Sequence, residues 1–188
     1  MADNEALFMP ELVFFDWECA TPGEVFARLE GELAPRGYIA SGWLDAVRAR
    51  EDAYPTGLAM PAANIAIPHT DPGFVAKPYI AVVKPASTVT FNAMAGMGAP
   101  VPAQIIINLG IAEPGGQVEA LQALMNIFMD VDAAADVLGQ TTCQGMVDAI
   151  RRHFKGRHLG TVPNCRQKRN VPNCRLSERS PLHQNGAD

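Results

Sequence analysis

The first third of the chain has apolar positions that change from a strand pattern to a helical one. Residues 12–16 (LVFFD) form a short run of strand-forming side chains, which predicts a first β-strand. Thr21 then precedes a proline in the first helical turn and a glutamate three residues after itself, which is typical of a helix N-terminus. The helix that follows places its apolar side chains on one face: Val25, Phe26, Leu29 and Leu33.

A second helix is predicted directly after the first, and it carries charged side chains at its C-terminal end. Ser41 is the expected N-cap, and the inward-facing side chains are Trp43, Leu44 and Val47. Arginine and acidic residues fill the last turn, and the sequence Tyr-Pro-Thr-Gly at 54–57 stops the helix.

The rest of the pattern predicts strands in the middle of the chain and helices after them. The predicted strands are residues 64–67, 79–83, 89–91 and 104–112. The last of these is apolar at consecutive positions, which is typical of a strand buried on both faces. From Gln117 the apolar residues recur every three or four positions, which predicts a helix. Two more helices are expected at 131–138 and 142–154, the second capped by Thr141 or Thr142.

These elements predict an α/β fold, a single layered domain with a central mixed β-sheet flanked by helices. Because periodicity stops near residue 155, the 188-residue chain is expected to divide into a domain at 8–155 and a flexible, disordered basic tail at 156–188. The longest apolar run, 105–112, is far shorter than the roughly 20 residues that cross a bilayer. The first twelve residues contain three acidic side chains and no basic one, unlike a secretory signal, so we expect a cytoplasmic protein.

The net charge of −5 is distributed unevenly along the chain. Residues 1–150 carry 6 basic and 18 acidic side chains, whereas residues 151–188 carry 9 basic and 2 acidic ones. Nucleic acids are held by basic surfaces, so the acidic body predicts no nucleic-acid partner. The basic tail is interpreted as a solvated terminus.

Cysteine and glycine spacing excludes several classes of site. The four cysteines form no CxxC pair, which argues against zinc and thioredoxin-like sites. Cys165 and Cys174 lie in a repeated VPNCR sequence, and in a reducing compartment we expect them to be free thiols. Neither a dinucleotide-binding glycine motif in its strand-to-helix context nor a phosphate-binding loop is present. The sequence therefore predicts no metal and no cofactor.

Among the four histidines, His69 is the candidate for chemistry. The other three lie in or after the basic C-terminal stretch, whereas His69 ends a predicted strand between Pro68 and the turn at 72–73. A lone histidine is more often structural, but a rigid loop at the end of a strand is where α/β proteins place reactive groups.

Three motifs around this histidine occur in a recognisable order. They are Arg-Glu-Asp at 50–52, Tyr-Pro-Thr-Gly-Leu at 54–58 and Asn-Ile-Ala-Ile-Pro-His-Thr-Asp at 64–71. Together they resemble the active-site signature of phosphotransferase-system enzyme IIA proteins of the fructose/mannitol superfamily, and most closely the galactitol-type subgroup. The resemblance covers about residues 8–155, the enzyme IIA type-2-like domain, and leaves out the tail.

This resemblance implies a phosphocarrier of a sugar phosphotransferase system. His69 is the residue that matches the histidine which accepts a phosphoryl group from the phosphocarrier protein HPr and passes it to a cysteine of enzyme IIB. The membrane enzyme IIC, an indirect partner, binds the sugar. The spacer residues 60–62 favour galactitol or polyol uptake. Two alternatives stay open: a regulatory phosphohistidine module of the same fold, as in the nitrogen-related branch, and a relative that no longer transfers phosphate.

The chemistry of imidazole agrees with this role. A neutral histidine is both a competent nucleophile and a good leaving group for phosphate. One ring nitrogen must stay unprotonated, so the other is expected to donate to a backbone carbonyl or to Asp71. The sequence leaves open which nitrogen attacks.

Three further residues are candidate phosphate ligands. Arg50 and the Thr56 hydroxyl are candidate donors to the transferred group, against the alternatives of a surface ion pair and a plain turn. In many relatives a second histidine stands where this chain has Gln117, whose amide can also donate, or which is a polar residue at a helix start. The expected apolar docking rim comprises Phe74, Met94 and Met97.

Overall fold

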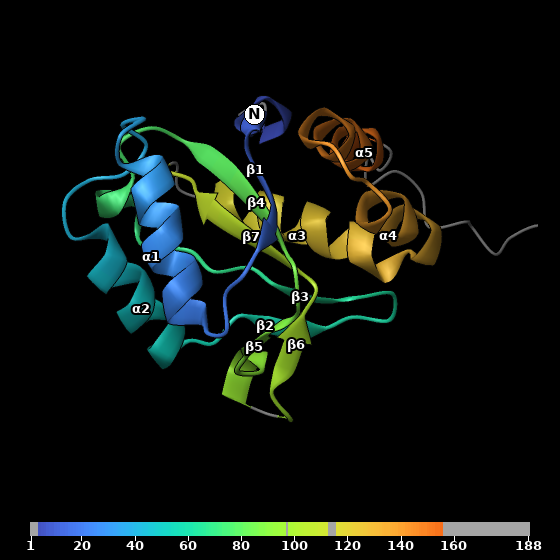
Figure 1. The fold of residues 1–188 in the computed structure, drawn as a ribbon, viewed down its shortest axis with the longest axis horizontal. Helices are drawn as coiled ribbons and strands as arrows, with labels where there is room; N and C mark the ends of the chain where they lie inside the picture. The colour runs from blue at the N-terminus through green and yellow to red at the C-terminus, as the bar shows by residue number, and fades with distance from the viewer. Residues whose placement is uncertain (1–3, 97, 113–115, 156–188) are drawn as a thin grey trace, which may run out of the picture. The chain divides into compact units, whose positions relative to one another are not determined.

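Five strands form a mixed sheet in the order β1–β4–β7–β3–β2 (Figure 1). The computed structural model describes residues 4–96, 98–112 and 116–155. The strands are β1 (Phe8–Trp17), β2 (Gly57–Ala59), β3 (Asn64–Ala66), β4 (Tyr79–Pro85) and β7 (Ile105–Gly110). β1 runs parallel to β4 and β3 runs parallel to β7, whereas the β4–β7 and β2–β3 pairs are antiparallel. The sheet is therefore mixed, as predicted.

Helices cover both faces of this sheet (Figure 1). One face packs against α1 (Pro22–Leu33) and α2 (Trp43–Ala53). The other packs against α3 (Gly116–Met129), α4 (Val131–Leu138) and α5 (Cys143–Lys155). The described residues also form three short 3₁₀ helices, η1 (Asn4–Leu7) directly before β1, and η2 (Pro72–Phe74) and η3 (Met94–Gly96) between strands. This layering confirms the predicted fold class.

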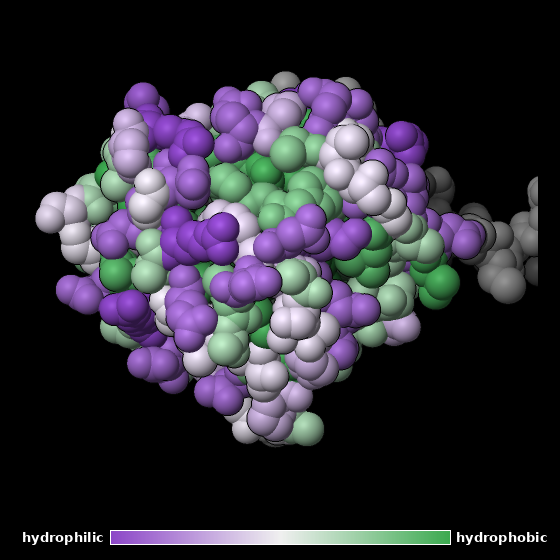
Figure 2. Space-filling model, in the orientation of Figure 1, coloured by the Kyte–Doolittle hydropathy of each residue, from purple (hydrophilic) through white to green (hydrophobic). Residues whose placement is uncertain are grey.

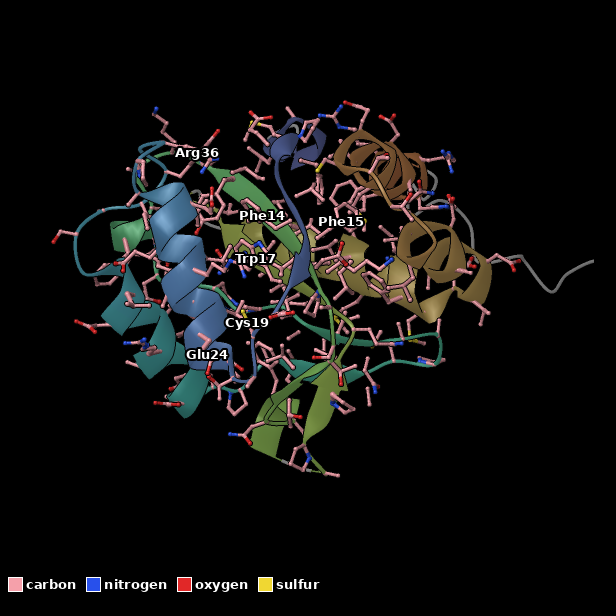
Figure 3. All side chains as sticks on the ribbon, in the orientation of Figure 1. Phe14, Phe15, Trp17, Cys19, Glu24 and Arg36 are labelled. Carbon is pink, nitrogen blue, oxygen red and sulfur yellow. The ribbon has the colours of Figure 1, made fainter. Side chains whose placement is uncertain are left out.

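Alternation along the strands divides the apolar side chains between two cores. Figure 3 labels neighbouring Phe14 and Phe15 on β1, and the first packs on the α1–α2 side while the second packs on the α3–α5 side. Strand β7 is buried at every position, because helices lie over both of its faces. The sequence prediction of a doubly buried strand is thus confirmed.

Helix starts show where local sequence signals were sufficient. The Thr21 hydroxyl accepts the Glu24 N–H at 3.3 Å, which confirms Thr21 as the N-cap of α1. The Thr142 hydroxyl accepts the Gly145 N–H at 3.1 Å and so caps α5. For α2 the prediction of Ser41 was wrong. The N-cap is Gly42, which has φ 83° and no side-chain cap bond, because the chain enters this helix through a left-handed turn.

Two short strands escaped prediction. Gly57, expected to belong to a turn, begins β2, and β6 (Val101–Ala103) pairs with β5 (Val89–Phe91) in a separate two-stranded sheet. Both are three residues long, and β6 contains a proline, so neither shows an alternating pattern. Only their hydrogen-bonded pairing, of β2 with β3 and of β6 with β5, makes them strands.

The outer edge of the sheet carries the apolar surface seen in Figure 2, where β1 passes between the two helical layers. Half-buried Phe14 and Phe15 contribute to it. Within the described ranges no helix is long and apolar enough to cross a membrane. The predicted tail at 156–188, including Cys165 and Cys174, lies outside the described residues.

Candidate functional site

His69 lies just beyond β3, where the preceding proline and a hydrogen bond from β7 restrain the backbone. Pro68 precedes it, and the Leu109 N–H on β7 donates to the Pro68 carbonyl at 3.1 Å. This forms an isolated bridge between His69 and Leu109. The imidazole is half-buried, so one part of the ring contacts the protein while another remains accessible.

Both ring nitrogens of His69 have partners. Nδ1 lies 3.0 Å from the Ile67 carbonyl oxygen, and Nε2 lies 3.3 Å from Nη2 of Arg50. A carbonyl only accepts and a guanidinium only donates, so Nδ1 carries the proton and Nε2 carries the lone pair. The structure thus selects the backbone carbonyl, of the two acceptors expected, to define the tautomer. Asp71 is exposed and precedes η2.

The surroundings of His69 favour its neutral form. Burial lowers the pKa of the imidazole below its ordinary value of 6.5, and the nearby positive charge of Arg50 acts in the same direction. The hydrogen bond to the Ile67 carbonyl and the charge of Asp71 raise the pKa and oppose this change only in part. At neutral pH Nε2 is therefore unprotonated and available for attack.

Arg50 is the cationic group of the site. It lies in the last turn of α2, and its guanidinium stacks 4.3 Å from the centroid of the Tyr54 ring. Its Nη1 is buried and has no hydrogen-bond partner among the described residues. None of the ion pairs in the described ranges joins Arg50 to Glu51 or Asp52. The guanidinium is thus directed to His69 and retains an unused donor.

Thr56 is bonded to Glu51 rather than left open toward the histidine. Its N–H and its hydroxyl both donate to the Glu51 carboxylate at 2.8 Å, and its side chain is 2% exposed. Burial raises the pKa of Glu51, while the two bonds from Thr56 oppose that rise. This pair fastens the 54–57 loop to the end of α2, where Arg50 lies. Direct donation from Thr56 to phosphate stays a prediction.

Gly57 is required by close packing. Its N–H donates to the Asn92 carbonyl at 3.0 Å, and a Cβ at this position would lie 2.6 Å from that oxygen. The absence of a side chain therefore lets the segment after β5 approach β2.

The described contacts do not place the remaining candidate residues from the sequence beside His69. Gln117 lies in the first turn of α3, but its side chain, like Met97, lies outside the described residues. Met94 lines a groove of about 490 Å³ between β2 and β6, whereas Phe74 packs near the start of α2. The structure thus places Met94 and Phe74 in separate surroundings, and their docking role stays a prediction.

A family comparison decides the class of this protein. The model of the family described as phosphoenolpyruvate-dependent sugar phosphotransferase system, EIIA 2, matches residues 6–152. The chain belongs to this family. Its members are phosphotransferases that act through phosphohistidine, and the chain is such a component of a sugar phosphotransferase system. The resemblance noted in the sequence is thereby confirmed.

Relatives of this EIIA protein include transport and regulatory proteins. The galactitol-specific EIIA component of Escherichia coli (strain K12) is 28% identical over 109 residues, 58% of this chain and 72% of the relative. The nitrogen regulatory protein IIA-Ntr from Neisseria meningitidis has a similar fold, with a TM-score of 0.63, 18% identity and coverage of 78% and 98% of the two chains. Enzyme IIAMtl, solved in complex with phosphorylated enzyme IIBMtl from Escherichia coli, has a TM-score of 0.59, 22% identity and coverage of 78% and 96%.

Residues that the sequence did not identify as site residues contribute to this EIIA site. Tyr54 ends α2, is 66% exposed and covers one face of the Arg50 guanidinium. Asn108 is wholly buried on β7 and donates to the Pro68 carbonyl at 3.0 Å. Its only sequence signal was a polar side chain inside an apolar run, and its partner lies 40 residues away.

The lowered pKa of His69 predicts how the ring titrates. In an NMR titration of the unphosphorylated protein, we expect the His69 midpoint to lie below the ordinary value of 6.5, because burial and Arg50 disfavour the cation. Removing the arginine charge with Arg50→Gln is expected to raise the midpoint. A wild-type midpoint above 6.5 would contradict the environment described for this ring.

The lowered pKa of His69 also determines how this ring affects the stability of the fold as the pH changes. A base whose pKa is lowered by folding stabilises the folded state at pH values above its pKa in the unfolded state. This contribution is lost as the pH falls through its pKa in the folded state. His69 therefore contributes to acid destabilisation below pH 6.5.

Proposed function

We propose that His69 is the phosphorylated histidine of this EIIA protein and that Nε2 is the nitrogen which accepts the phosphoryl group. The observation that carries the proposal is the pair of bonds at the ring. Nδ1 is committed to the Ile67 carbonyl, which leaves the lone pair of Nε2 as the nucleophile, next to Arg50. A fixed tautomer spares the reaction the cost of reorienting the ring.

The transfer consists of two displacements at phosphorus, of which the first exchanges one phosphorus–nitrogen bond for another and the second exchanges a phosphorus–nitrogen bond for a phosphorus–sulfur bond. The lone pair of Nε2 attacks the phosphorus of phospho-HPr, and the bond to the donor histidine breaks with its electron pair returning to that donor. In the second step the thiolate of an enzyme IIB cysteine attacks, and the electron pair returns to Nε2. Neither step needs a metal or a cofactor for its atoms and electrons to balance.

Arg50 serves as the ligand of the transferred group in this proposal. Once Nε2 is phosphorylated it no longer accepts from Nη2, so that donor becomes available to a phosphoryl oxygen. The buried Nη1, which has no partner among the described residues, supports the same role. A guanidinium presents its donors in a rigid fork that matches phosphate oxygens, and stacking on Tyr54 keeps this fork oriented.

The comparisons support the proposed route of the phosphoryl group and the proposed class of sugar. The galactitol-specific relative supports a cytoplasmic protein that transfers a phosphoryl group from HPr to an enzyme IIB for galactitol or polyol uptake. The mannitol relative, solved with phosphorylated enzyme IIB, supports an acceptor of that class. The membrane enzyme IIC binds the sugar and is therefore only an indirect partner of this protein.

The alternative is a regulatory module that uses the same phosphohistidine to control protein binding. The fold shared with nitrogen regulatory protein IIA-Ntr supports keeping it. The two functions differ in the fate of the phosphoryl group, since a carrier releases it to a cysteine and a regulator retains it.

A two-step transfer assay tests the proposal. Labelled phosphoenolpyruvate, enzyme I and HPr are expected to load one phosphoryl group on the protein, and added galactitol-type enzyme IIB is expected to remove it within the time of mixing. Loading without release to any enzyme IIB would favour the regulatory module. Absence of loading would contradict both functions.

A further inference from the structure

A buried chain of polar groups leads from the start of β4 to the backbone beside His69. Tyr79 on β4 donates its hydroxyl to Oδ1 of Asn108 on β7 at 2.7 Å. Nδ2 of Asn108 in turn donates to the Pro68 carbonyl at 3.0 Å. Tyr79 and Asn108 are each 0% exposed, although apolar side chains dominate the surrounding core.

Burying these groups carries an energetic cost that packing alone does not require. A buried hydroxyl or amide that lacks partners destabilises the fold, so such groups persist only where their bonds are formed. An aliphatic side chain at position 108 would fill the same space without that risk. The polar pair therefore points to a task at the far end of the chain of bonds.

The direction of the bonds is determined by the Pro68 carbonyl. This oxygen only accepts, so the Asn108 amide must present its NH₂ group to it. Oδ1 then faces Tyr79, which donates. Burial raises the pKa of Tyr79, so the hydroxyl keeps its proton. The ring of Tyr79 lies where position 110 has no side chain, since a Cβ on Gly110 would lie 2.0 Å from its Cε1.

The hydrogen bonds that restrain the Pro68 carbonyl also restrain the position of the His69 imidazole. The proline ring restrains φ, so ψ of Pro68 is the soft torsion between the Ile67 carbonyl and His69. The Pro68 oxygen accepts from both the Leu109 N–H at 3.1 Å and Asn108 Nδ2 at 3.0 Å, which uses both of its lone pairs. Rotation about ψ would break these bonds and move Nδ1 away from the Ile67 carbonyl, 3.0 Å distant.

We propose that Tyr79 and Asn108 are positioning residues that maintain the tautomer and aim of His69 by clamping the Pro68 carbonyl. They act through the backbone and touch neither phosphoryl donor nor acceptor. The inference rests on the proposed role of His69, because only a reacting imidazole needs its Nε2 aimed.

Two variants test the clamp. Asn108→Leu removes the side-chain donor to Pro68 with little change of volume, and phosphoryl acceptance is expected to slow about tenfold to a hundredfold, the range for a misplaced reacting group. Tyr79→Phe keeps the ring against Gly110 and removes the hydrogen bond to Asn108, for which about a twofold to tenfold loss is expected. Both losses are expected in kcat, with KM for phospho-HPr unchanged, because docking is not altered.

A readout independent of transfer separates positioning from folding. Nitrogen-15 shifts of His69 above pH 8 are expected to show the Nδ1–H tautomer in the wild type and a mixture with the Nε2–H tautomer in Asn108→Leu. Ile106→Val, two residues earlier on the same face of β7, is the matched control. It leaves a small cavity in the same core and is expected to keep the wild-type tautomer and rate.

The outcomes distinguish this inference from the proposed function. Folded Asn108→Leu or Tyr79→Phe with wild-type rate and tautomer would overturn the clamp, as would equal losses in Ile106→Val. If Asn108→Leu does not fold, Tyr79→Phe alone decides. A wild type that accepts no phosphoryl group, while the variants still shift the tautomer, would reject the proposed function and leave the clamp standing.

Discussion

The His69→Ala variant is expected to lose all acceptance of labelled phosphoryl groups from phospho-HPr. The substitution removes the nucleophilic Nε2, and the other histidine in the described domain, His153, is bonded to Asp136 on α4 at 2.8 Å. Autoradiography after incubation with labelled phosphoenolpyruvate, enzyme I and HPr measures the result. A phosphoramidate is expected in the wild type, so the label should be labile in acid and stable in base.

His153→Ala is the matched control for this experiment, since it makes the same substitution within the domain. It is expected to retain full labelling. The half-buried ring of His69 is not part of the apolar core, so the His69→Ala protein should remain folded by circular dichroism. Normal labelling of folded His69→Ala would reject His69 as the acceptor.

Loss of Arg50 is expected to give the second largest effect. Arg50→Ala should slow phosphoryl acceptance about tenfold to thousandfold, because charge develops on the phosphoryl oxygens and a lost transition-state donor costs that much. Rapid-quench measurement of single-turnover transfer from phospho-HPr gives the rate. Arg50→Lys keeps the charge and loses the fork, so an intermediate rate is expected.

The chain provides a close control in Arg48. This residue lies two positions before Arg50 on the same helix, is exposed, and approaches the Gly23 carbonyl at 3.5 Å. Arg48→Ala is expected to transfer at nearly the wild-type rate. Equal slowing in Arg48→Ala and Arg50→Ala would assign the effect to general surface charge and contradict a specific ligand at Arg50.

The fold was readable wherever a short stretch of sequence contains its own physical reason. The alternation of apolar residues every three or four positions predicted α1, and the consecutive apolar positions of β7 predicted burial on both faces. Prediction was wrong at Ser41, where the left-handed conformation of Gly42 replaces a side-chain cap. It missed β2 and β6, because strands of three residues are defined by their pairing with β3 and β5 and not by a pattern of their own.

Some features of the site could likewise be predicted from local sequence, and others could not. Pro68 and the strand before His69 specify a rigid histidine, and the three ordered motifs carry the family. The partner of Nε2 and the side chain that bonds Pro68 follow no local pattern. Arg50 lies 19 residues before it and Asn108 lies on another strand, so only folding shows that the first reaches Nε2 and the second reaches Pro68. The bond from Thr56 to Glu51 was equally invisible in the spacing of the motif.

The sequence by itself determined the layered α/β class, the phosphotransferase family and the histidine most suited to carry phosphate. Local periodicity and motif order are properties of neighbouring residues, so they survive without coordinates. The tertiary structure decided which ring nitrogen is free, which guanidinium faces it and which buried amide holds the adjacent carbonyl. The first depends on how the chain turns at Pro68 to bring Nδ1 to the Ile67 carbonyl. The other two are hydrogen bonds between segments far apart in the chain, and they exist only once the sheet has brought those segments together.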